Sequence, residues 1–321
     1  MDFSLTDDQE LLRDTAHKLL ERECPPALVR AHIDDPSVYE SLWRHLAEYV
    51  ALGNGPATDA CLFLEQTGYV AAPGPFLATL LFRSLAGDDV DRGATTGTIA
   101  LVGDDTHPFV LEADRVESVA IVLPGPKLAV VGASDLGVTF VPNVDFSRRL
   151  FTLAAPPARA EPLDPARLAA WRDRAHALLA AEMVGIARRI FDMSLQYAKE
   201  REQFDRPIGS FQAIQHKLAD MSLALERATA AVHYAAMTVD AADAERERAC
   251  HVAQAAAGEA ARRILKDGAQ IHGGIGYTWE HDLHLYLRRA TADEYLLGST
   301  GWHLDRLADL VMGPSQAVRG L

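Results

Sequence analysis

The chain changes its hydrophobic periodicity twice, and these two changes constrain its fold more than any other feature. Between residues 91 and 164, short β-branched runs alternate with Gly, Pro and Asp. Runs of this kind are typical of strands. On both sides of this segment, apolar residues recur at the spacing of amphipathic helices. Because the middle segment is long enough for a small sheet and little more, we expect an α+β fold that is mostly α-helical.

The two changes divide the chain into three predicted domains. We expect an N-terminal helical domain at residues 1–90, a small, truncated middle β domain at 91–164 and a C-terminal four-helix-bundle domain at 165–321. Four runs in the middle segment predict strands: TGTIALV, ESVAIVLP, KLAVVGA and GVTFVP. The Pro-rich APPARAEPLD, at residues 155–164, is interpreted as a linker. This order of elements favours helices packed around a small sheet, followed by a helical bundle.

Local signals set the expected helix ends. Residues 6–23 predict an amphipathic helix that begins with a capping box of Thr6 and Gln9. CPP at 24–26 stops this helix. Further N-terminal helices are expected at 38–50, at 57–71 and in a run that ends near Leu85. The expected C-terminal helices are 165–202, 210–241, 243–271, 280–297 and 300–312. Ser210 is the predicted N-cap of the second of these.

The composition argues against several classes of function. The net charge of −14 disfavours a broad nucleic-acid surface. No apolar run is long enough to cross a bilayer, and MDFSLTDDQELL lacks the basic and apolar regions of a signal peptide. Cys24, Cys61 and Cys250 show neither a disulfide framework nor zinc-site spacing. We therefore expect a cytoplasmic protein without nucleic-acid or membrane partners.

The segment REQFDRPIGSFQAIQHKLADM, at residues 201–221, points most clearly to a ligand. It predicts a helix C-terminus, a turn and a helix N-terminus. Arg201 lies where a cation suits the helix dipole, and the free N–H groups of the next helix can bind an anion such as a diphosphate. A well-capped helical hairpin, with Arg201 in a surface ion pair, explains the same residues. Composition alone favours that simpler interpretation.

Three separated segments nevertheless resemble one family. Residues 201–221 resemble the acyl-CoA dehydrogenase signature, in which Arg, Phe, a Pro-Ile-Gly turn, Phe-Gln and Leu-Ala-Asp-Met recur in this order. MDFSLTDDQELLRDTA resembles the N-terminal helix of that family, and AQIHGGIGY resembles its C-terminal Gln-x-x-Gly-Gly-x-Gly element. The order of helices, strands and helices is also that of the family's three-domain fold.

The resemblance implies an FAD-dependent enzyme that desaturates an acyl-CoA and passes electrons to an electron-transfer flavoprotein. FAD lies between two subunits in that family, and the C-terminal bundle of one subunit contacts the ADP half. The matching residues here are Arg201, Gln203, Phe204, Gln212, Gln270, Gly273 and Gly274. The arginine can pair with the diphosphate, and the phenylalanine can pack on a ring. The glutamines can hydrogen-bond, and the glycines let the backbone approach the cofactor.

The chain departs from the family at the flavin ring and at the catalytic base. Residues 91–164 contain neither the Thr-Glu-Pro-x-x-Gly-Ser-Asp-like stretch nor the Trp-(Ile/Val)-(Thr/Ser)-Asn stretch that contacts the isoalloxazine. The usual position of the family's catalytic Glu is Leu297 here, and the alternative position is Ala175. Proton removal beside the thioester needs a carboxylate in a dry site. We therefore assign no catalytic residue.

Other acids are weaker candidates for the base. Glu182 lies on an apolar helical face, where a carboxylate more often serves helix packing than catalysis. Asp173 lies near the alternative base position. Asp293 and Glu294 are interpreted as a solvated face or an ion pair.

The sequence gives little indication of a metal site at the histidines around Gly273 and Gly274. His272 is expected to contact the cofactor, a partner or its own fold. His281 and His284 have His-x-x-His spacing, but no further ligands are evident in the sequence, so we expect no metal. LRRA, at residues 287–290, predicts a packing and ion-pair element.

The chain keeps the ADP-side residues and lacks those for the flavin ring and the base. This combination favours a subunit that works together with a second, related chain. The leading hypothesis is a subunit of a heterotetrameric (α2β2) acyl-CoA dehydrogenase, in which a full-length paralogue supplies the flavin bed and the base. The chain resembles the short subunits of actinobacterial enzymes that shorten sterol side chains, which implies a bulky acyl-CoA and steroid degradation. Two alternatives stay open. One is a self-sufficient homomeric dehydrogenase with Glu182 as a displaced base, and the other is a non-catalytic scaffold subunit.

Overall fold

The computed structural model describes residues 4–87 and 96–313. Helix α1 (Asp7–Glu23) begins at the predicted capping box. The Thr6 hydroxyl accepts a hydrogen bond from the Gln9 N–H at 3.3 Å, and the Gln9 side chain accepts one from the Thr6 N–H at 3.1 Å. Two N–H groups at this helix end therefore have side-chain partners.

The prolines after α1 start a second helix, which the sequence did not predict. Helix α2 (Pro26–Asp34) has Pro26 as its first residue. Proline suits that position because the N–H that it lacks would have no partner within the helix. The other N-terminal helices are α3 (Tyr39–Leu46), α4 (Ala57–Tyr69) and α5 (Phe76–Ala86), with 3-10 turns at Pro36–Val38 and Ala47–Asn54.

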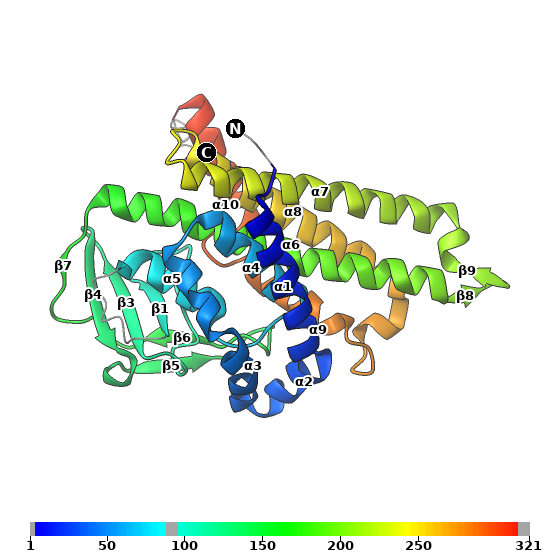
Figure 1. The fold of residues 1–321 in the computed structure, drawn as a ribbon, viewed down its shortest axis with the longest axis horizontal. Helices are drawn as coiled ribbons and strands as arrows, with labels where there is room; N and C mark the ends of the chain where they lie inside the picture. The colour runs from blue at the N-terminus through cyan, green and yellow to red at the C-terminus, as the bar shows by residue number, and fades with distance from the viewer. Residues whose placement is uncertain (1–3, 88–95, 314–321) are drawn as a thin grey trace, which may run out of the picture.

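The middle segment folds into two small sheets, drawn at the left of Figure 1. The strands are β1 (Gly97–Leu101), β2 (Val110–Leu111), β3 (Ser118–Leu123), β4 (Lys127–Gly132), β5 (Val138–Val141), β6 (Leu150–Leu153) and β7 (Glu161–Pro162). One sheet has the order β1-β3-β4-β7, with β1 and β3 parallel, and the other has the antiparallel order β2-β6-β5. Strands β1, β3, β4 and β5 were predicted. Strands β2 and β7 have only two residues each, too few to show a period of two, and β6 was missed although it is as long as β5.

The C-terminal segment forms a helical bundle that extends to the right in Figure 1. Its helices are α6 (Pro165–Glu200), α7 (Gln212–Asp240), α8 (Arg246–His272), α9 (Leu283–Asp293) and α10 (Thr300–Met312). A two-stranded hairpin, β8 (Glu202–Gln203) and β9 (Arg206–Pro207), joins α6 to α7 at the far end. Helix α6 packs against α7, α8 and α4, so it links the bundle to the N-terminal helices.

Ser210 does not cap α7, contrary to the prediction. The N-cap is Phe211, and the Ser210 hydroxyl donates a hydrogen bond to the Pro207 carbonyl at 2.7 Å. A 3-10 turn at Ile208–Ser210 precedes the helix. The serine hydroxyl therefore closes this turn instead of capping the helix.

Helices α4 and α6 cross at a contact that two glycines permit. A Cβ on Gly185 would lie 1.9 Å from the Glu65 carbonyl oxygen, and a Cβ on Gly68 would lie 2.1 Å from the Glu182 carbonyl oxygen. The two backbones therefore pack directly against each other. This crossing places Glu182 deep between the bundle and the N-terminal helices.

The architecture is the expected mostly helical α+β fold, with small sheets between the N-terminal helices and the C-terminal helices. The predicted boundary between residues 90 and 91 lies outside the described residues. Cys24, Cys61 and Cys250 are buried free thiols. Among the described residues, none of the helices has the length and apolar character needed to span a membrane.

Candidate functional site

The end of the bundle that carries the β8–β9 hairpin holds all seven predicted ADP-side residues (Figure 1). Arg201 is the C-cap of α6, and Gln203 and Phe204 lie in the hairpin. Gln212 is the first residue of α7. The remaining three lie where α8 ends, namely Gln270, Gly273 and Gly274.

Two contacts hold the ends of α6, α7 and α8 beside one another. The Tyr197 ring stacks on the His272 ring, with 4.5 Å between their centroids. The Lys217 ammonium of α7 pairs with the Asp267 carboxylate of α8 at 2.5 Å. Tyr197 lies one turn before the α6 C-cap, and His272 is the last residue of α8. The predicted cation and glycines therefore occupy neighbouring helix ends.

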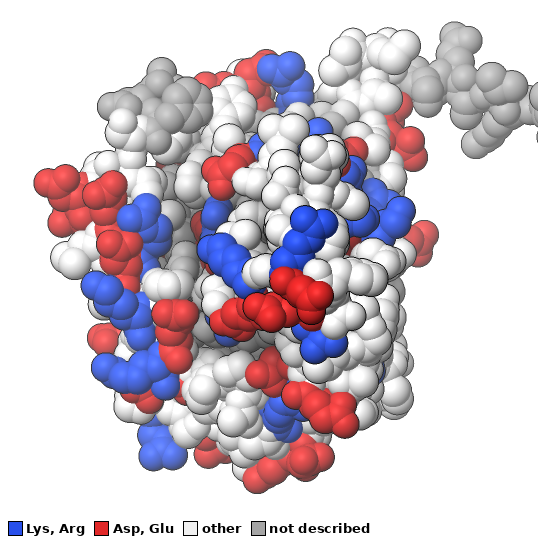
Figure 2. Space-filling view, turned by 90° about the vertical axis from the view of Figure 1, so that its right-hand side faces the viewer, with Lys and Arg blue, Asp and Glu red and all other residues white. Residues whose placement is uncertain are grey.

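The predicted side chains face solvent instead of this chain's own core. Phe204 is 86% exposed, and its φ of 56° lies in the left-handed region, which is uncommon for a residue other than glycine. A Cβ on Gly273 or Gly274 would meet nothing within 4 Å, so a ligand can approach the backbone there. Figure 2 looks onto this end and shows basic and acidic side chains interspersed. A guanidinium, a helix N-terminus and open glycine backbone can together hold an anion.

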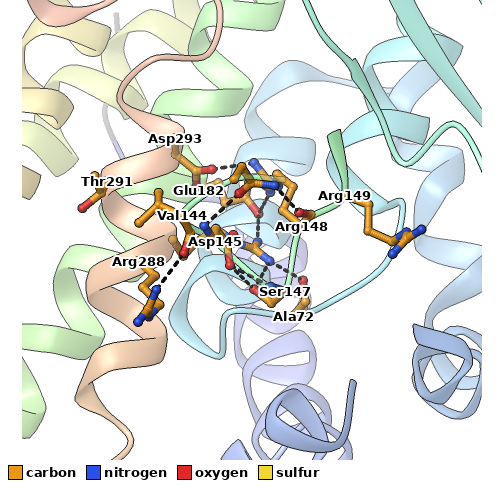
Figure 3. A network of polar contacts seen from close by, with 12 residues as sticks. Ala72, Val144, Asp145, Ser147, Arg148, Arg149, Glu182, Arg288, Thr291 and Asp293 are labelled. Atoms are coloured by element: carbon orange, nitrogen blue, oxygen red, sulfur yellow. Dashed lines mark hydrogen bonds and ion pairs between the residues drawn. The ribbon is translucent and has the colours of Figure 1, made fainter. Parts of the chain in front are cut away.

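A second polar group lies buried where the middle segment meets the helices (Figure 3). Arg148 donates to both Glu182 carboxylate oxygens, at 2.8 and 2.7 Å, and to the Asp293 carboxylate at 2.6 Å. Arg289 of α9 pairs with Asp145 and also lies 3.2 Å from a Glu182 oxygen. These five side chains, which we call the buried charge network, are each at most 6% exposed.

The buried charge network holds two guanidinium groups and three carboxylates, so full ionisation would leave one excess negative charge. Burial raises the pKa of Asp293. The Arg148 guanidinium opposes this rise in pKa, and the Glu182 carboxylate adds to it. Asp293 Oδ2 also has no hydrogen-bond partner among the described residues. A proton on Asp293 balances the charge of the network.

The geometry of Glu182 favours the packing interpretation over the role of a displaced base. Both of its oxygens accept hydrogen bonds from Arg148, and one also contacts Arg289. A general base needs a free oxygen within reach of the proton that it removes. The ion pairs of Arg289 confirm the packing and ion-pair role that LRRA predicts.

The other candidate acids are also held in ion pairs. Asp293 is fully buried, so the solvated-face interpretation is wrong for it and the ion-pair alternative is confirmed. Glu294 lies 3.3 Å from the Arg262 guanidinium. Asp173 accepts a hydrogen bond from Arg246 at 2.9 Å, and burial raises its pKa.

Both positions at which the resemblance led us to expect a catalytic Glu are buried and apolar. Ala175 lies in α6, and Leu297 lies between α9 and α10; they are 0% and 4% exposed. The next residue, Gly298, donates its N–H to the Thr106 carbonyl at 3.1 Å and so fixes this loop against the middle segment. Neither alkyl side chain can accept a proton.

The three predicted histidines pack within the C-terminal segment. His272 Nδ1 lies 2.8 Å from the Gly268 carbonyl oxygen. The His281 ring lies edge-on to His272, at 4.8 Å between centroids, and His284 packs edge-on to Trp279 at 4.5 Å. Burial lowers the pKa of all three imidazoles. These contacts give His272 a structural role.

The sequence did not single out Arg148 or the histidines at 176, 251 and 303. Arg148 contacts residues that lie 34 and 145 positions away in the chain, and no local pattern encodes such partners. His176, in AHALLAA, interrupts an apolar helical run. That interruption is a signal in the sequence for a polar group on a buried helix face, as Glu182 is a few residues later.

Comparison with known proteins agrees with this architecture. The family profile described as "Acyl-CoA dehydrogenase, C-terminal domain" matches residues 173–312. The chain is similar to "Acyl-CoA dehydrogenase IpdE2" of Mycobacterium tuberculosis, with 35% identity over 318 residues that cover 94% of this chain and 96% of that protein.

Two solved structures share the fold over nearly the whole chain. One is the "Tcur3481-Tcur3483 steroid ACAD G363A variant", with a TM-score of 0.85 and 27% identity, covering 95% of this chain and 98% of that chain. The other is the ChsE4-ChsE5 complex of Mycobacterium tuberculosis, with a TM-score of 0.82 and 21% identity, covering 98% and 100%. At that lower identity, the second similarity concerns the fold alone.

Proposed function

The chain belongs to the acyl-CoA dehydrogenase family, and we propose that it is the smaller subunit of an α2β2 enzyme that desaturates a steroid-derived acyl-CoA. A full-length paralogue supplies the flavin bed and the catalytic Glu, and this chain supplies contacts to the ADP half of the partner's FAD. The division at residues 1–90, 91–164 and 165–321 is part of this proposal. Two similar structures are named for pairs of proteins, and one of them is named a steroid enzyme, which supports both the partner and the substrate class.

One observation carries the proposal. The seven residues that match the ADP side lie together and open to solvent, whereas both positions for a base hold buried alkyl groups. A chain that worked alone would need a carboxylate beside the substrate's α-carbon. Glu182, the buried candidate for this carboxylate, already accepts hydrogen bonds from Arg148 on both of its oxygens.

The exposed face fits an ADP group in its chemistry. Arg201 offers a guanidinium for diphosphate oxygens, and Phe204 offers a ring face for stacking. Gln212 and Gln270 offer amides, and the open backbone at Gly273 permits close approach. When bound, FAD would supply the acceptor for a hydride from the β-carbon of the acyl chain. In the proposed complex, the residues of this chain only bind and orient the ADP half.

Apolar side chains around the same face support the presence of a partner. Phe204, Ile275 and Tyr277 are 86%, 41% and 73% exposed. Large apolar side chains that gather on a surface mark interaction sites. The partner subunit covers them in our proposal, and electrons leave the enzyme to an electron-transfer flavoprotein.

The test is co-expression with a full-length family member from the same genome, followed by measurement of FAD per chain. We expect about one FAD per pair of chains and little FAD in the lone chain. Arg201→Ala should weaken FAD binding by the complex by roughly tenfold to a hundredfold, because a charge-assisted hydrogen bond is lost. Arg227→Ala is the matched control, since Arg227 is an exposed cation of α7 that pairs with Glu259.

The same experiment separates the alternatives. Stoichiometric FAD and activity in the lone chain would overturn the proposal in favour of a homomeric enzyme with Glu182 as the base. A stable complex whose FAD content is unchanged by Arg201→Ala and Gln270→Ala would instead identify a scaffold subunit.

A further inference from the structure

Three histidines from three helices meet beside Ala175 and the loop at Leu297. His176 of α6, His251 of α8 and His303 of α10 have ring centroids 4.8 to 5.2 Å apart. Each ring offers one nitrogen, and these three nitrogens all lie within 4.8 Å of one another. We call these residues the histidine cluster.

The histidine cluster lies in surroundings that disfavour the charged form of its rings. His176 and His251 are each 5% exposed, and His303 is fully buried. Burial lowers the pKa of His251 to about 4 and of His303 to about 3, and it lowers the pKa of His176 well below its usual value. Each neutral imidazole keeps one nitrogen lone pair, which is the form that binds metal ions.

Protein groups satisfy these rings only in part. His251 Nδ1 and His303 Nδ1 lie 2.8 Å apart, so one ring donates a hydrogen bond to the other. His176 Nδ1 and His303 Nε2 are buried without a hydrogen-bond partner among the described residues. Buried polar atoms without partners are costly and uncommon. A cation between the rings would give His176 Nδ1 a partner, whereas His303 Nε2 would stay beside the backbone of Leu297 and Gly298.

A cavity of about 550 Å³ opens beside the histidine cluster. His176, His251 and Trp302 contribute to its lining, together with the Asp173–Arg246 ion pair. A ligand or water can therefore reach the cluster from one side. The remaining sides are closed by the packing of α6, α8 and α10.

We propose that His176, His251 and His303 bind one divalent transition-metal ion, for which Zn²⁺ has the best-matched chemistry. Zn²⁺ accepts three imidazole nitrogens and keeps a fourth position for water or another ligand, whereas Mg²⁺ and Ca²⁺ prefer oxygen ligands. Tetrahedral Zn–N bonds of about 2.0–2.1 Å place two ligand nitrogens about 3.3 Å apart, so metal binding separates the two facing Nδ1 atoms, now 2.8 Å apart, and brings a His176 nitrogen toward them. The two facing rings bind through Nδ1 once the donor ring has moved its proton to Nε2, so no proton is lost overall.

The proposed site is independent of the partner subunit and of FAD. All three ligands come from this chain, and they join the last described helix to the two long helices α6 and α8. Metal binding to the folded chain alone stabilises it by mass action. A measurable consequence is a higher Tm with Zn²⁺, which a chelator reverses.

The test uses the full-length chain after treatment with a chelator and dialysis, titrated with Co²⁺ and then with Zn²⁺. We expect the visible absorption bands of tetrahedral Co²⁺ at about one equivalent per chain, their loss when Zn²⁺ displaces Co²⁺, and a raised Tm. A stripped wild-type chain that shows neither the bands nor a Tm shift overturns the proposal without any variant.

Substitutions then locate the ligands. His251→Gln and His303→Gln should each weaken Co²⁺ binding by at least about tenfold. His251→Cys should keep binding and add a thiolate charge-transfer band. His284→Gln is the matched control, because His284 is also buried and neither of its ring nitrogens has a hydrogen-bond partner within residues 4–87 and 96–313. Loss of binding in His284→Gln, with full binding in His251→Gln and His303→Gln, would contradict the assignment.

Discussion

Arg148 connects carboxylates from two helices in a place that water hardly reaches. Its guanidinium contacts Glu182 through two hydrogen bonds and Asp293 through a third, and it is 6% exposed. Buried ion pairs contribute little net stability, because desolvation offsets their attraction. Loss of one partner is different, since it leaves the opposite charge buried and unpaired.

Replacement of Arg148 by Met should therefore destabilise the chain strongly. We expect a loss of about 3–5 kcal/mol in the free energy of unfolding, because Asp293 and Glu182 stay buried and lose the Arg148 guanidinium, which leaves Arg289 as the cation beside Glu182. Urea denaturation monitored by circular dichroism measures it. Arg227→Ala, which breaks an exposed pair with Glu259, should cost less than about 1 kcal/mol. Equal costs for the two variants would show that Arg148 is not an essential partner.

The histidine cluster predicts how stability changes in acid. The folded-state pKa values of His176, His251 and His303 lie below the usual value. Below about pH 6.5 the unfolded chain therefore binds protons that the folded chain does not, and stability falls as pH falls. Each such histidine contributes a slope of about 1.4 kcal/mol per pH unit until its folded pKa is reached.

His303→Gln should reduce the slope of the free energy of unfolding against pH by about 1.4 kcal/mol per pH unit between roughly pH 6 and 4, which is the contribution of one bound proton. The measurement is the free energy of unfolding in urea at several pH values, with chelator present so that metal ions do not contribute. Parallel pH profiles for the variant and the wild type would refute the assignment of a neutral buried His303.

At the scale of elements, the crossing of α4 and α6 depends on the absence of side chains at two positions. Gly185→Ala places a Cβ 1.9 Å from the Glu65 carbonyl oxygen, and neither helix backbone can yield freely. We expect a loss of about 1–3 kcal/mol or more in the free energy of unfolding. Gly274→Ala is the control, because its Cβ would meet nothing within 4 Å. A tolerated Gly185→Ala would mean that the helices separate at little cost.

Helices were predictable from the sequence because their signals are local. Thr6 and Gln9 encode the start of α1 within one turn, and apolar periodicity marked the five long C-terminal helices. The errors were also local. Pro26 starts a helix where a stop was expected, and Ser210 closes a turn where an N-cap was expected. In both places one residue type suits two structures, and the following backbone decides between them.

The candidate sites were predictable only in part, because the residues of some sites lie far apart in the sequence. The ADP-side residues were found because they lie in two short motifs. Their role in binding stays a prediction. The buried charge network and the histidine cluster bring together residues from segments that are tens to hundreds of positions apart. No local spacing encodes these contacts, so they became visible only once the helices were packed.

At the scale of the whole molecule, the bundle end that we propose for FAD also serves as the proposed contact with the partner subunit. Tyr277 is 73% exposed at this end. Tyr277→Ser should weaken the heteromer by roughly tenfold, because an aromatic contact at an interface is lost, with little change in Tm. Leu11→Ser is the control, since Leu11 is 66% exposed on α1. Sedimentation of the co-expressed pair over a range of concentrations measures the dissociation constant, and equal values for both variants would place the interface elsewhere.

The buried charge network has a consequence for how the chain comes apart. Arg148 belongs to the middle segment, Glu182 and Asp293 belong to the bundle, and Arg289 reaches the Ala72 carbonyl of the N-terminal segment. Neither the middle segment nor the bundle can detach without leaving a charge of the network unpaired, and loss of the N-terminal segment would remove a hydrogen-bond acceptor from Arg289. Melting should therefore be a single cooperative transition, and a fragment such as 165–321 expressed by itself should be vulnerable to proteases.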